Sequence, residues 1–230
     1  METNTESIIR LAWARTLGLP DEALMQPTGA RLTRQDDSLI MFVALWEHRV
    51  LVAPAWLLDR AEGLSSADLA SGSRLLLLAA GHGGRLLDEV VLSFTDAYVD
   101  HPELDRVVVS NEADAVAALE RSCPPDDVAE VGFSAMGERF VTLDEQDQPT
   151  AGAGYAESQG ILAALGVLTM PPLRRRGHGA LAAAVATNDA LDAGLVPQWR
   201  ARRGHRPSAS LARSLRYREI GAQTTVLLTN

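Results

Sequence analysis

The sequence predicts an α/β protein of the α+β type, with helices packed against a mixed sheet. Apolar residues make up 47% of the 230 residues, which is enough to bury a sizeable core. Short apolar runs typical of strands are interspersed with helical patterns, and their order does not alternate strictly. We therefore expect two domains, a smaller α+β domain over residues 1–100 and a larger mixed-sheet domain over residues 105–230.

The first hundred residues contain both helical and strand patterns. Ile9, Trp13 and Leu17 are four residues apart, which predicts one face of a helix over residues 6–19. The further elements expected here are strands at 38–46 and 49–54 around a turn at Glu47 and His48, a helix at 65–81 and a strand at 88–94. The polar stretch 96–105, which contains Pro102, is the expected domain boundary.

The second half has a more informative order. The expected elements are a strand at 106–109, helices at 111–122 and 125–135, strands at 139–145, 150–157 and 161–170, a helix ending near Ala193, a strand at 196–201, a helix at 207–215 and one or two strands at 217–228. Gly194 stops the long helix. The resulting order, β-α-α-β-β-β-α-β-α-β, predicts a mixed layer rather than a doubly wound sheet.

The composition argues against several classes of function. The formal net charge is −9 and the isoelectric point is near 5.0, whereas affinity for nucleic acid requires a basic surface. No apolar run is long enough to span a membrane, and the acidic, polar first ten residues do not resemble a signal peptide. A cytoplasmic protein is therefore expected. With one cysteine, Cys123, and no histidine spacing typical of zinc ligands, we expect no metal site.

A turn rich in arginine and glycine, LRRRGHGAL at 173–181, connects an apolar strand that ends at Pro171 to the long helix. The first N–H groups of a helix lack internal partners, and the helix dipole makes this end positive. Glycine allows the backbone to approach a ligand closely, and arginine adds forked donors. These features predict a site for phosphate or pyrophosphate. The alternative is a solvated arginine cluster with two ordinary turn glycines.

This stretch resembles the acyl-CoA-binding segment of the GCN5-related N-acetyltransferase (GNAT) family, whose signature is R/Q-x-x-G-x-G/A at the start of a helix. Here it reads Arg174-Arg175-Arg176-Gly177-His178-Gly179, preceded by Val167-x-Thr169-x-Pro171. The later HRPSASLARSLRY, residues 205–217, resembles the family's N-x-x-S-x-x-x-x-x-x-L-G-F segment, with Ser208, Leu215 and Tyr217 in register. The resemblance covers residues 106–228, a little over half of the chain.

The resemblance implies an acyl-CoA N-acyltransferase-like fold in the C-terminal half and acetyl-CoA as cosubstrate. The implied binding residues are Val167, Leu168 and Thr169 for pantetheine, Arg174, Arg175, Arg176, Gly177, His178, Gly179 and Ala180 for pyrophosphate, and Ser208 near the thioester sulfur. Residues 1–100 carry no comparable signature, so they are interpreted either as a degenerate second copy of the fold or as a lineage-specific substrate domain.

Three residues depart from the family pattern. His205 stands where Asn is usual, Arg216 where Gly is usual, and Ala212 where many members have a tyrosine that protonates the leaving thiolate. The strand position at which some members carry a glutamate base corresponds to Ala163. Candidate groups for proton transfer are Glu157, at the end of a strand, and Tyr155, two residues earlier and so on the same face. Their alternative roles are a solvated carboxylate and a core tyrosine.

The sequence thus favours an N-acetyltransferase that transfers an acetyl group directly to a primary amine of a small molecule or peptide, with no covalent intermediate at Cys123. The missing tyrosine and glutamate leave a second hypothesis open, a non-catalytic acyl-CoA-binding or regulatory module. Among partners, we expect an amine acceptor and neither nucleic acid nor membrane. A homodimer is left open.

Overall fold

The computed structural model describes residues 1–26 and 29–229. The chain divides into two compact units, each assembled from separate segments. The first contains Met1–Thr5, Phe94–Trp199 and Ser210–Arg218, and the second contains Glu6–Ser93, Arg200–Ala209 and Glu219–Asn230. The expected domains, 1–100 and 105–230, are continuous in sequence, whereas these units are not. The division into domains at 1–100 and 105–230 therefore stays a prediction.

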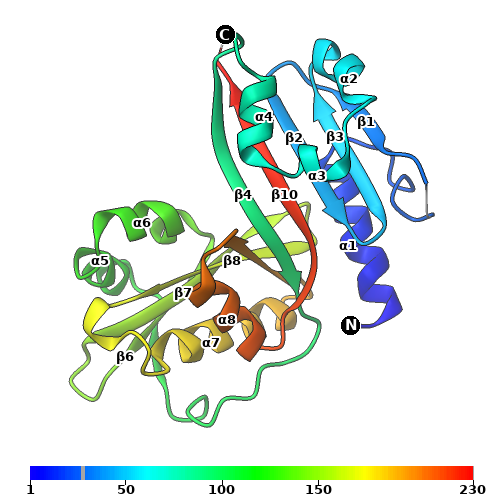
Figure 1. Ribbon diagram of the computed structural model, residues 1–230. Helices are drawn as coiled ribbons and strands as arrows, with labels where there is room; N and C mark the ends of the chain where they lie inside the picture. Colours follow the sequence, from blue (N-terminus) through cyan, green and yellow to red (C-terminus); the bar gives the residue numbers. More distant parts are fainter. Residues whose placement is uncertain (27–28, 230) are drawn as a thin grey trace. The chain divides into compact units, whose positions relative to one another are not determined.

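The first unit contains a mixed sheet with helices on both of its faces (Figure 1). Its elements are β5 (Val108–Ser110), α5 (Ala113–Arg121), α6 (Pro125–Val131), β6 (Glu138–Leu143), β7 (Pro149–Ser158), β8 (Leu162–Thr169), α7 (His178–Asp192) and part of each of β9 (Val196–Arg202) and α8 (Arg206–Ser214). The strand order is β9-β8-β7-β6-β5. Only the β8–β9 pair among these is parallel. The element order predicted for this half is confirmed.

Side chains alternate between the two faces of this sheet and create two separate cores. On one face, Leu168 packs with Leu119 of α5 and Phe133, which follows α6. On the other face, Tyr155 and Ala163 pack with Ala190 of α7. Alanine at many buried positions of α7, including Ala182, Ala183, Ala184 and Ala186, permits close approach of the helix to the strands.

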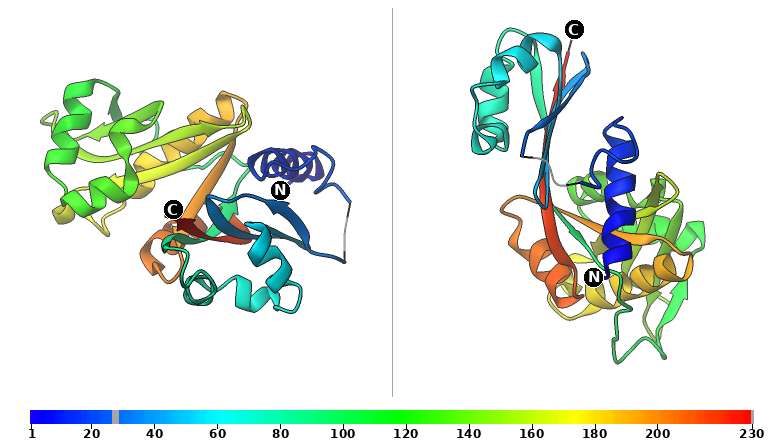
Figure 2. Two further views of the ribbon diagram at one scale, coloured as in Figure 1. Left: turned by 90° about the horizontal axis from the view of Figure 1, so that it is seen from above. Right: turned by 90° about the vertical axis from the view of Figure 1, so that its right-hand side faces the viewer.

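The second unit has the strand order β1-β3-β2-β10-β4. Its elements are the larger part of α1 (Thr3–Thr16), β1 (Leu32–Gln35), β2 (Leu39–Leu45), β3 (His48–Ala53), α2 (Ala55–Ala61), α3 (Ser66–Leu69), α4 (Gly72–Leu78), β4 (Gly84–Phe94) and β10 (Arg218–Leu228). The short helices α2, α3 and α4 cover one face of the sheet, and α1 lies on the other (Figure 2). The closing segment forms one strand, β10.

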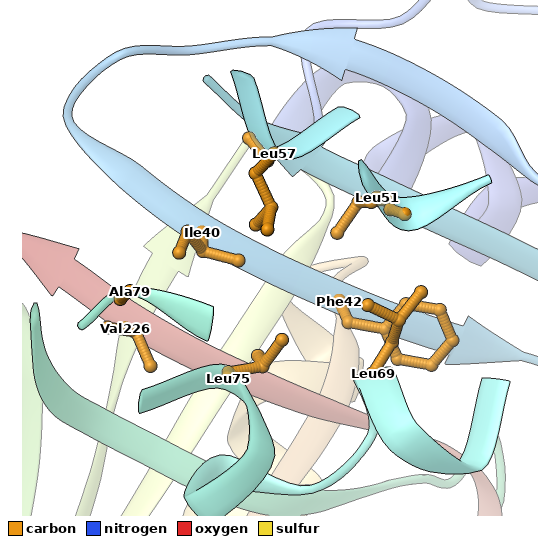
Figure 3. Close-up of a cluster of buried hydrophobic side chains, with 10 residues drawn as sticks. Ile40, Phe42, Leu51, Leu57, Leu69, Leu75, Ala79 and Val226 are labelled. Atoms are coloured by element: carbon orange, nitrogen blue, oxygen red, sulfur yellow. The ribbon is translucent and has the colours of Figure 1, made fainter. Parts of the chain in front are cut away.

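A hydrophobic core lies beneath the three short helices. Ile40 and Phe42 of β2 point toward Leu57 of α2, Leu69 of α3 and Leu75 of α4 (Figure 3). All five side chains are at most 2% exposed. The apolar run over residues 38–46 thus forms the strand β2 that it predicted.

Three local expectations in this unit were wrong. The single helix expected at 65–81 is in fact two helices. A capping box of Ser65 and Asp68 begins α3, which ends at Leu69, and a second helix, α4, begins at Gly72. A Cβ on Gly72 would lie 2.8 Å from Glu89 Oε2, so close packing favours glycine there. The turn between β2 and β3 lies at Trp46 and Glu47 instead of Glu47 and His48. In addition, β1 and α2 were not expected.

Within the described ranges, 1–26 and 29–229, the structure has no helix long and apolar enough to cross a membrane.

Candidate acyl-CoA site

Strands β8 and β9 separate part of the way along β8. The pairing of β8 with β7 runs from Ser158↔Leu162 to Ala151↔Thr169. The parallel pairing of β8 with β9 runs only from Leu162↔Val196 to Leu165↔Trp199. Residues 166–169 of β8 therefore extend beyond the pairing with β9, and we call this segment the open edge. It includes the predicted pantetheine-binding residues.

Backbone directions along the open edge follow from two hydrogen bonds. The Val196 N–H donates to Ile161 O (2.8 Å), on the β9 side, whereas the Met170 N–H donates to Thr150 O (3.3 Å), on the β7 side. Because successive backbone groups alternate in direction, Val167 and Thr169 direct their N–H and C=O groups toward the open side. Leu168 directs its own toward β7. Of the three residues predicted to pair with pantetheine, Val167 and Thr169 have the required direction.

The N-terminus of α7 begins at Gly177, which has a φ of 93°. Two N–H groups, those of Ala180 and Leu181, already donate to Gly177 O at 2.8 and 3.0 Å. The first N–H groups of a helix have no acceptor within it. The N–H groups of Gly177, His178 and Gly179 are therefore the donors at this helix end that suit an anion. The amide of Ala180, which was also predicted to bind, serves the helix itself.

The helix N-terminus lies directly against the open edge. A Cβ on Gly179 would lie 2.6 Å from Thr169 Oγ1 and 3.7 Å from Val167 Cγ1. The second glycine of the signature thus allows α7 to approach β8. By contrast, an added Cβ on Gly177 would meet no atom within 4 Å, so Gly177 is required for its positive φ. The structure brings Val167, Thr169, Gly177 and Gly179 together.

The three arginines of the turn are exposed, and with Pro171 and Pro172 they line an open depression. Arg174 has two internal partners, because its Nη2 forms an ion pair with Asp127 of α6 and its Nε donates to Thr169 O at 3.2 Å. It therefore fastens the turn to α6 and to the end of β8. The backbone of Arg175 is in the left-handed region, with a φ of 62°. Asp127 was not anticipated, since only the fold brings it near Arg174.

Tyr155, predicted for proton transfer, is 4% exposed and faces α7. Its hydroxyl donates to Asp189 Oδ2 at 2.7 Å. Burial and this hydrogen bond raise the pKa of Tyr155, so the phenol stays protonated at neutral pH. Asp189 lies in the second half of α7, away from the helix N-terminus. The sequence did not single out this aspartate.

Glu157 is exposed and pairs in register with Ala163. At about 3.3 Å per residue, this position lies roughly 13 Å along β8 from Val167. Tyr155 pairs with Leu165, at about half that separation. The structure thus brings Tyr155 nearer to the open edge than Glu157. The catalytic roles of both residues stay predictions.

The second motif continues from α8 into the segment before β10. Ser208 belongs to the second unit and is partly buried on α8, and its role stays a prediction. Ala212 is buried. The hydroxyl of Tyr217 lies 2.9 Å from Thr187 Oγ1 of α7, and its ring packs edge-on against Trp199. Tyr217, which the resemblance places in register with the second motif, therefore packs within the first unit, and its hydroxyl is paired with Thr187.

The cysteine and the potential metal ligands also bear on the chemistry of the site. Cys123 is buried, and burial raises the pKa of its thiol, which disfavours the thiolate that a nucleophile requires. Across residues 1–26 and 29–229, no three histidine, cysteine, aspartate or glutamate side chains gather in a way that could hold a metal ion.

Comparison with solved structures shows the class of fold. A GCN5-related N-acetyltransferase-like protein from Streptococcus suis matches 97% of this chain and 98% of its own, with a TM-score of 0.51 and 18% identity. A GCN5-related N-acetyltransferase from Kribbella flavida matches 68% of this chain and 64% of its own (TM-score 0.46, 20% identity). A GNAT-family acetyltransferase from Colwellia psychrerythraea matches 67% of this chain and 61% of its own (TM-score 0.49, 10% identity).

This chain therefore has the GNAT fold, as expected for its C-terminal half. The full-length match to the Streptococcus suis protein extends the likeness across the N-terminal residues as well. The Kribbella and Colwellia matches each take in less than two thirds of those chains. No protein-family model matches the sequence, and a comparison with curated protein sequences finds no relative.

Proposed function

We propose that the protein is an acetyl-CoA-dependent N-acetyltransferase that acetylates a primary amine of a small molecule or peptide. The observation that carries the proposal is the juxtaposition of the open edge of β8 with the N-terminus of α7, through the contact of Thr169 with Gly179. An extended strand edge suits the amide groups of pantetheine, and a helix N-terminus suits a pyrophosphate.

The residues present fit this cosubstrate. Val167 offers a backbone N–H and C=O toward the open side, and Gly177, His178 and Gly179 offer N–H groups at the helix end. Arg175 and Arg176 add positive charge along the depression. In the reaction, the amine nitrogen attacks the thioester carbonyl, and the Val167 N–H stabilises the oxyanion that develops. The C–S bond then breaks, the attacking nitrogen gives up a proton, and the leaving thiolate takes one up.

Tyr155 and Glu157 stay predictions as the groups that transfer protons. The raised pKa makes Tyr155 a weaker acid than an ordinary tyrosine, and its hydroxyl already donates to Asp189. The support for its role is therefore its pairing with Leu165, two residues before Val167 of the open edge. The exposure of Glu157 leaves its carboxylate accessible to water, through which a base can act.

Calorimetric titration with acetyl-CoA, using two matched glycine variants, tests the binding site. Gly177 and Gly194 flank the two ends of α7, have φ values of 93° and 76°, and have no atom within 4 Å of an added Cβ. Both Gly177→Ala and Gly194→Ala strain a left-handed residue. Only Gly177→Ala places a methyl group at the proposed pyrophosphate site. We expect at least a tenfold loss of acetyl-CoA affinity for Gly177→Ala alone.

Equal affinities in both variants, or no saturable binding by the wild type, would contradict the proposal. Catalysis is tested with a panel of primary amines and acetyl-CoA, by detecting the free thiol of released CoA. Turnover on any amine supports the acetyltransferase, and saturable binding without turnover across the panel favours the non-catalytic module.

A further inference from the structure

Gln198 on β9 is a buried polar residue without a complete set of hydrogen bonds. The side chain is 4% exposed, and its Nε2 has no hydrogen-bond partner within the described residues. Leaving a buried donor unpaired is unfavourable, and buried side-chain amides are nearly always paired. The flanking residues Pro197 and Trp199 are also buried. An unpaired amide at this place therefore requires an explanation.

The position of Gln198 is next to the point where β8 and β9 separate. Gln198 pairs in register with Ala164, and the following pair, Leu165 with Trp199, is the last one. Side chains on paired residues share a face of the sheet and alternate along each strand. Gln198 therefore lies on the same face as Ala164 and Gly166, and Gly166 is the first residue of the open edge.

The separation is short enough for a glutamine side chain. A strand spacing of about 4.8 Å and two residues of about 3.3 Å each place the Cα atoms of Gln198 and Gly166 roughly 8 Å apart. Long side chains reach such diagonal neighbours. The carboxamide of Gln198 can therefore extend toward the start of the open edge.

The residues of β8 on this face are small, and Met136 and Val131 pack above Gly166. Ala164 has a single methyl group, and Gly166 has no side chain. The space above Gly166 is taken by Met136, whose Cε lies 2.3 Å from the position that a Cβ on Gly166 would occupy. Met136 is half-buried and unbranched, so it can change rotamer more readily than a branched side chain. A change of the Met136 rotamer would open space above Gly166 on this face.

We propose that Gln198 is a recognition residue for the acyl group, donating its Nε2–H to the carbonyl oxygen of the thioester. This inference rests on the proposed function. The Val167 N–H and the Gln198 amide would then contact the same carbonyl oxygen, one from the backbone of β8 and the other from a side chain of β9. The unpaired donor in the free protein acquires its acceptor when the acyl-CoA binds.

The proposal predicts discrimination between acetyl-CoA and its thioether analogue S-ethyl-CoA, which has the same number of carbon atoms and no carbonyl. One hydrogen bond of about 1.4 kcal/mol corresponds to a tenfold change in affinity. We expect calorimetry to show the wild type binding acetyl-CoA more than tenfold more tightly than S-ethyl-CoA, because the carbonyl accepts from both the Val167 N–H and the Gln198 amide. In Gln198→Leu, a near-isostere without donors, this preference falls about tenfold, the part due to the Val167 N–H remains, and the affinity for CoA itself is unchanged.

Gln223→Leu is the matched control. Gln223 is also buried, at 5% exposure, but its Oε1 accepts from Arg200 (3.0 Å) and its Nε2 donates to Thr225 Oγ1 (2.8 Å). Removing this paired amide lowers the free energy of unfolding, because it removes both of these hydrogen bonds from a buried position. Removing the unpaired amide of Gln198 leaves the free energy of unfolding unchanged or raises it. Gln198→Met provides a second apolar variant if Gln198→Leu does not fold.

The outcomes separate this inference from the proposed function. If the wild type binds none of the three CoA compounds, both fail. If it binds acetyl-CoA but the leucine and methionine variants keep the full wild-type preference over S-ethyl-CoA, only the role of Gln198 is overturned. A loss of stability in Gln198→Leu comparable to that of Gln223→Leu, with the preference retained, would make Gln198 a structural residue.

Discussion

Thr169 on β8 and Gly179 on α7 are in such close contact that a single added carbon atom would disturb it. A Cβ on Gly179 would lie 2.6 Å from Thr169 Oγ1, well inside normal van der Waals contact. This contact holds the N-terminus of α7 against the open edge of β8. The second glycine of the Gly-His-Gly sequence thus has a packing role that the pattern of an anion-binding turn does not require.

The first prediction concerns this contact. Gly179→Ala forces Thr169, whose β-branched side chain is stiff, to move. Overpacking of this kind lowers the free energy of unfolding by about 1–3 kcal/mol. The higher helix propensity of alanine offsets about 1 kcal/mol of that loss. We expect a net loss of about 1 kcal/mol in the free energy of unfolding, measured by urea denaturation. In a Thr169→Ala background, Gly179→Ala should instead raise the free energy of unfolding. If the effects of the two substitutions on the free energy of unfolding are additive, the contact is not tight.

The second prediction concerns Arg216, which ends α8 with a φ of 63°. The Tyr217 N–H donates to Ala212 O at 3.0 Å and the Arg216 N–H to Arg213 O at 3.1 Å, the arrangement of a Schellman motif. Glycine adopts this conformation without the strain of a side chain. We expect Arg216→Gly to raise the free energy of unfolding by about 0.5–1 kcal/mol. Arg213→Gly, within the helix, should lower it by about 1 kcal/mol; losses in both variants would refute the assignment of strain to Arg216.

The third prediction compares two tyrosines. Tyr155 donates to the Asp189 carboxylate, whereas Tyr217 shares a hydrogen bond with the neutral hydroxyl of Thr187. Hydrogen bonds to charged groups contribute about 1.5–3 kcal/mol and neutral ones about 0.5–1.5 kcal/mol. Thermal or urea unfolding should therefore show a greater loss of stability for Tyr155→Phe than for Tyr217→Phe.

The same pair of variants tests the predicted catalytic role of Tyr155. If Tyr155 transfers a proton, Tyr155→Phe lowers kcat at least tenfold with little change in the KM for acetyl-CoA, and Tyr217→Phe does not. Unchanged kcat in folded Tyr155→Phe would leave the hydroxyl with a structural role only.

The fourth prediction concerns His48, which is 1% exposed at the start of β3. Burial lowers the pKa of His48, an effect that the nearby Arg10 reinforces and the Glu47 carboxylate, 3.1 Å from Nε2, opposes. The unfolded chain takes up a proton below pH 6.5, the ordinary pKa, which the folded protein resists. The free energy of unfolding should therefore fall as the pH drops below 6.5, by at most about 1.4 kcal/mol per pH unit for this group.

His48→Gln should flatten this dependence between pH 6.5 and pH 5, a range above the ordinary pKa values of the carboxylates. Urea denaturation at several pH values measures the slope. His205→Gln, at an exposed position, is the control and should keep the wild-type slope. If His48→Gln keeps it as well, His48 does not cause the acid sensitivity.

Local patterns in the sequence were sufficient for the elements around the candidate site. The apolar strand before Pro171, the glycines at 177 and 179 and the stop at Gly194 act over a few neighbouring residues, so they predict β8, the turn and α7 directly. Local patterns do not contain contacts between distant residues, and this explains the wrong expectation at 65–81. There, Gly72 contacts Glu89, seventeen residues away, and this contact favours a break in the helix.

The sequence by itself determined the strand, the turn and the helix whose N-terminus suits an anion. It could do so because turns and helix termini depend on adjacent residues. Only the tertiary structure decided where β9 leaves β8, that Arg174 pairs with Asp127, that Tyr155 is held by Asp189, and that Gln198 is buried beside the open edge. These relationships join residues that are distant in sequence. They depend on packing and on strand register, which a one-dimensional pattern does not encode.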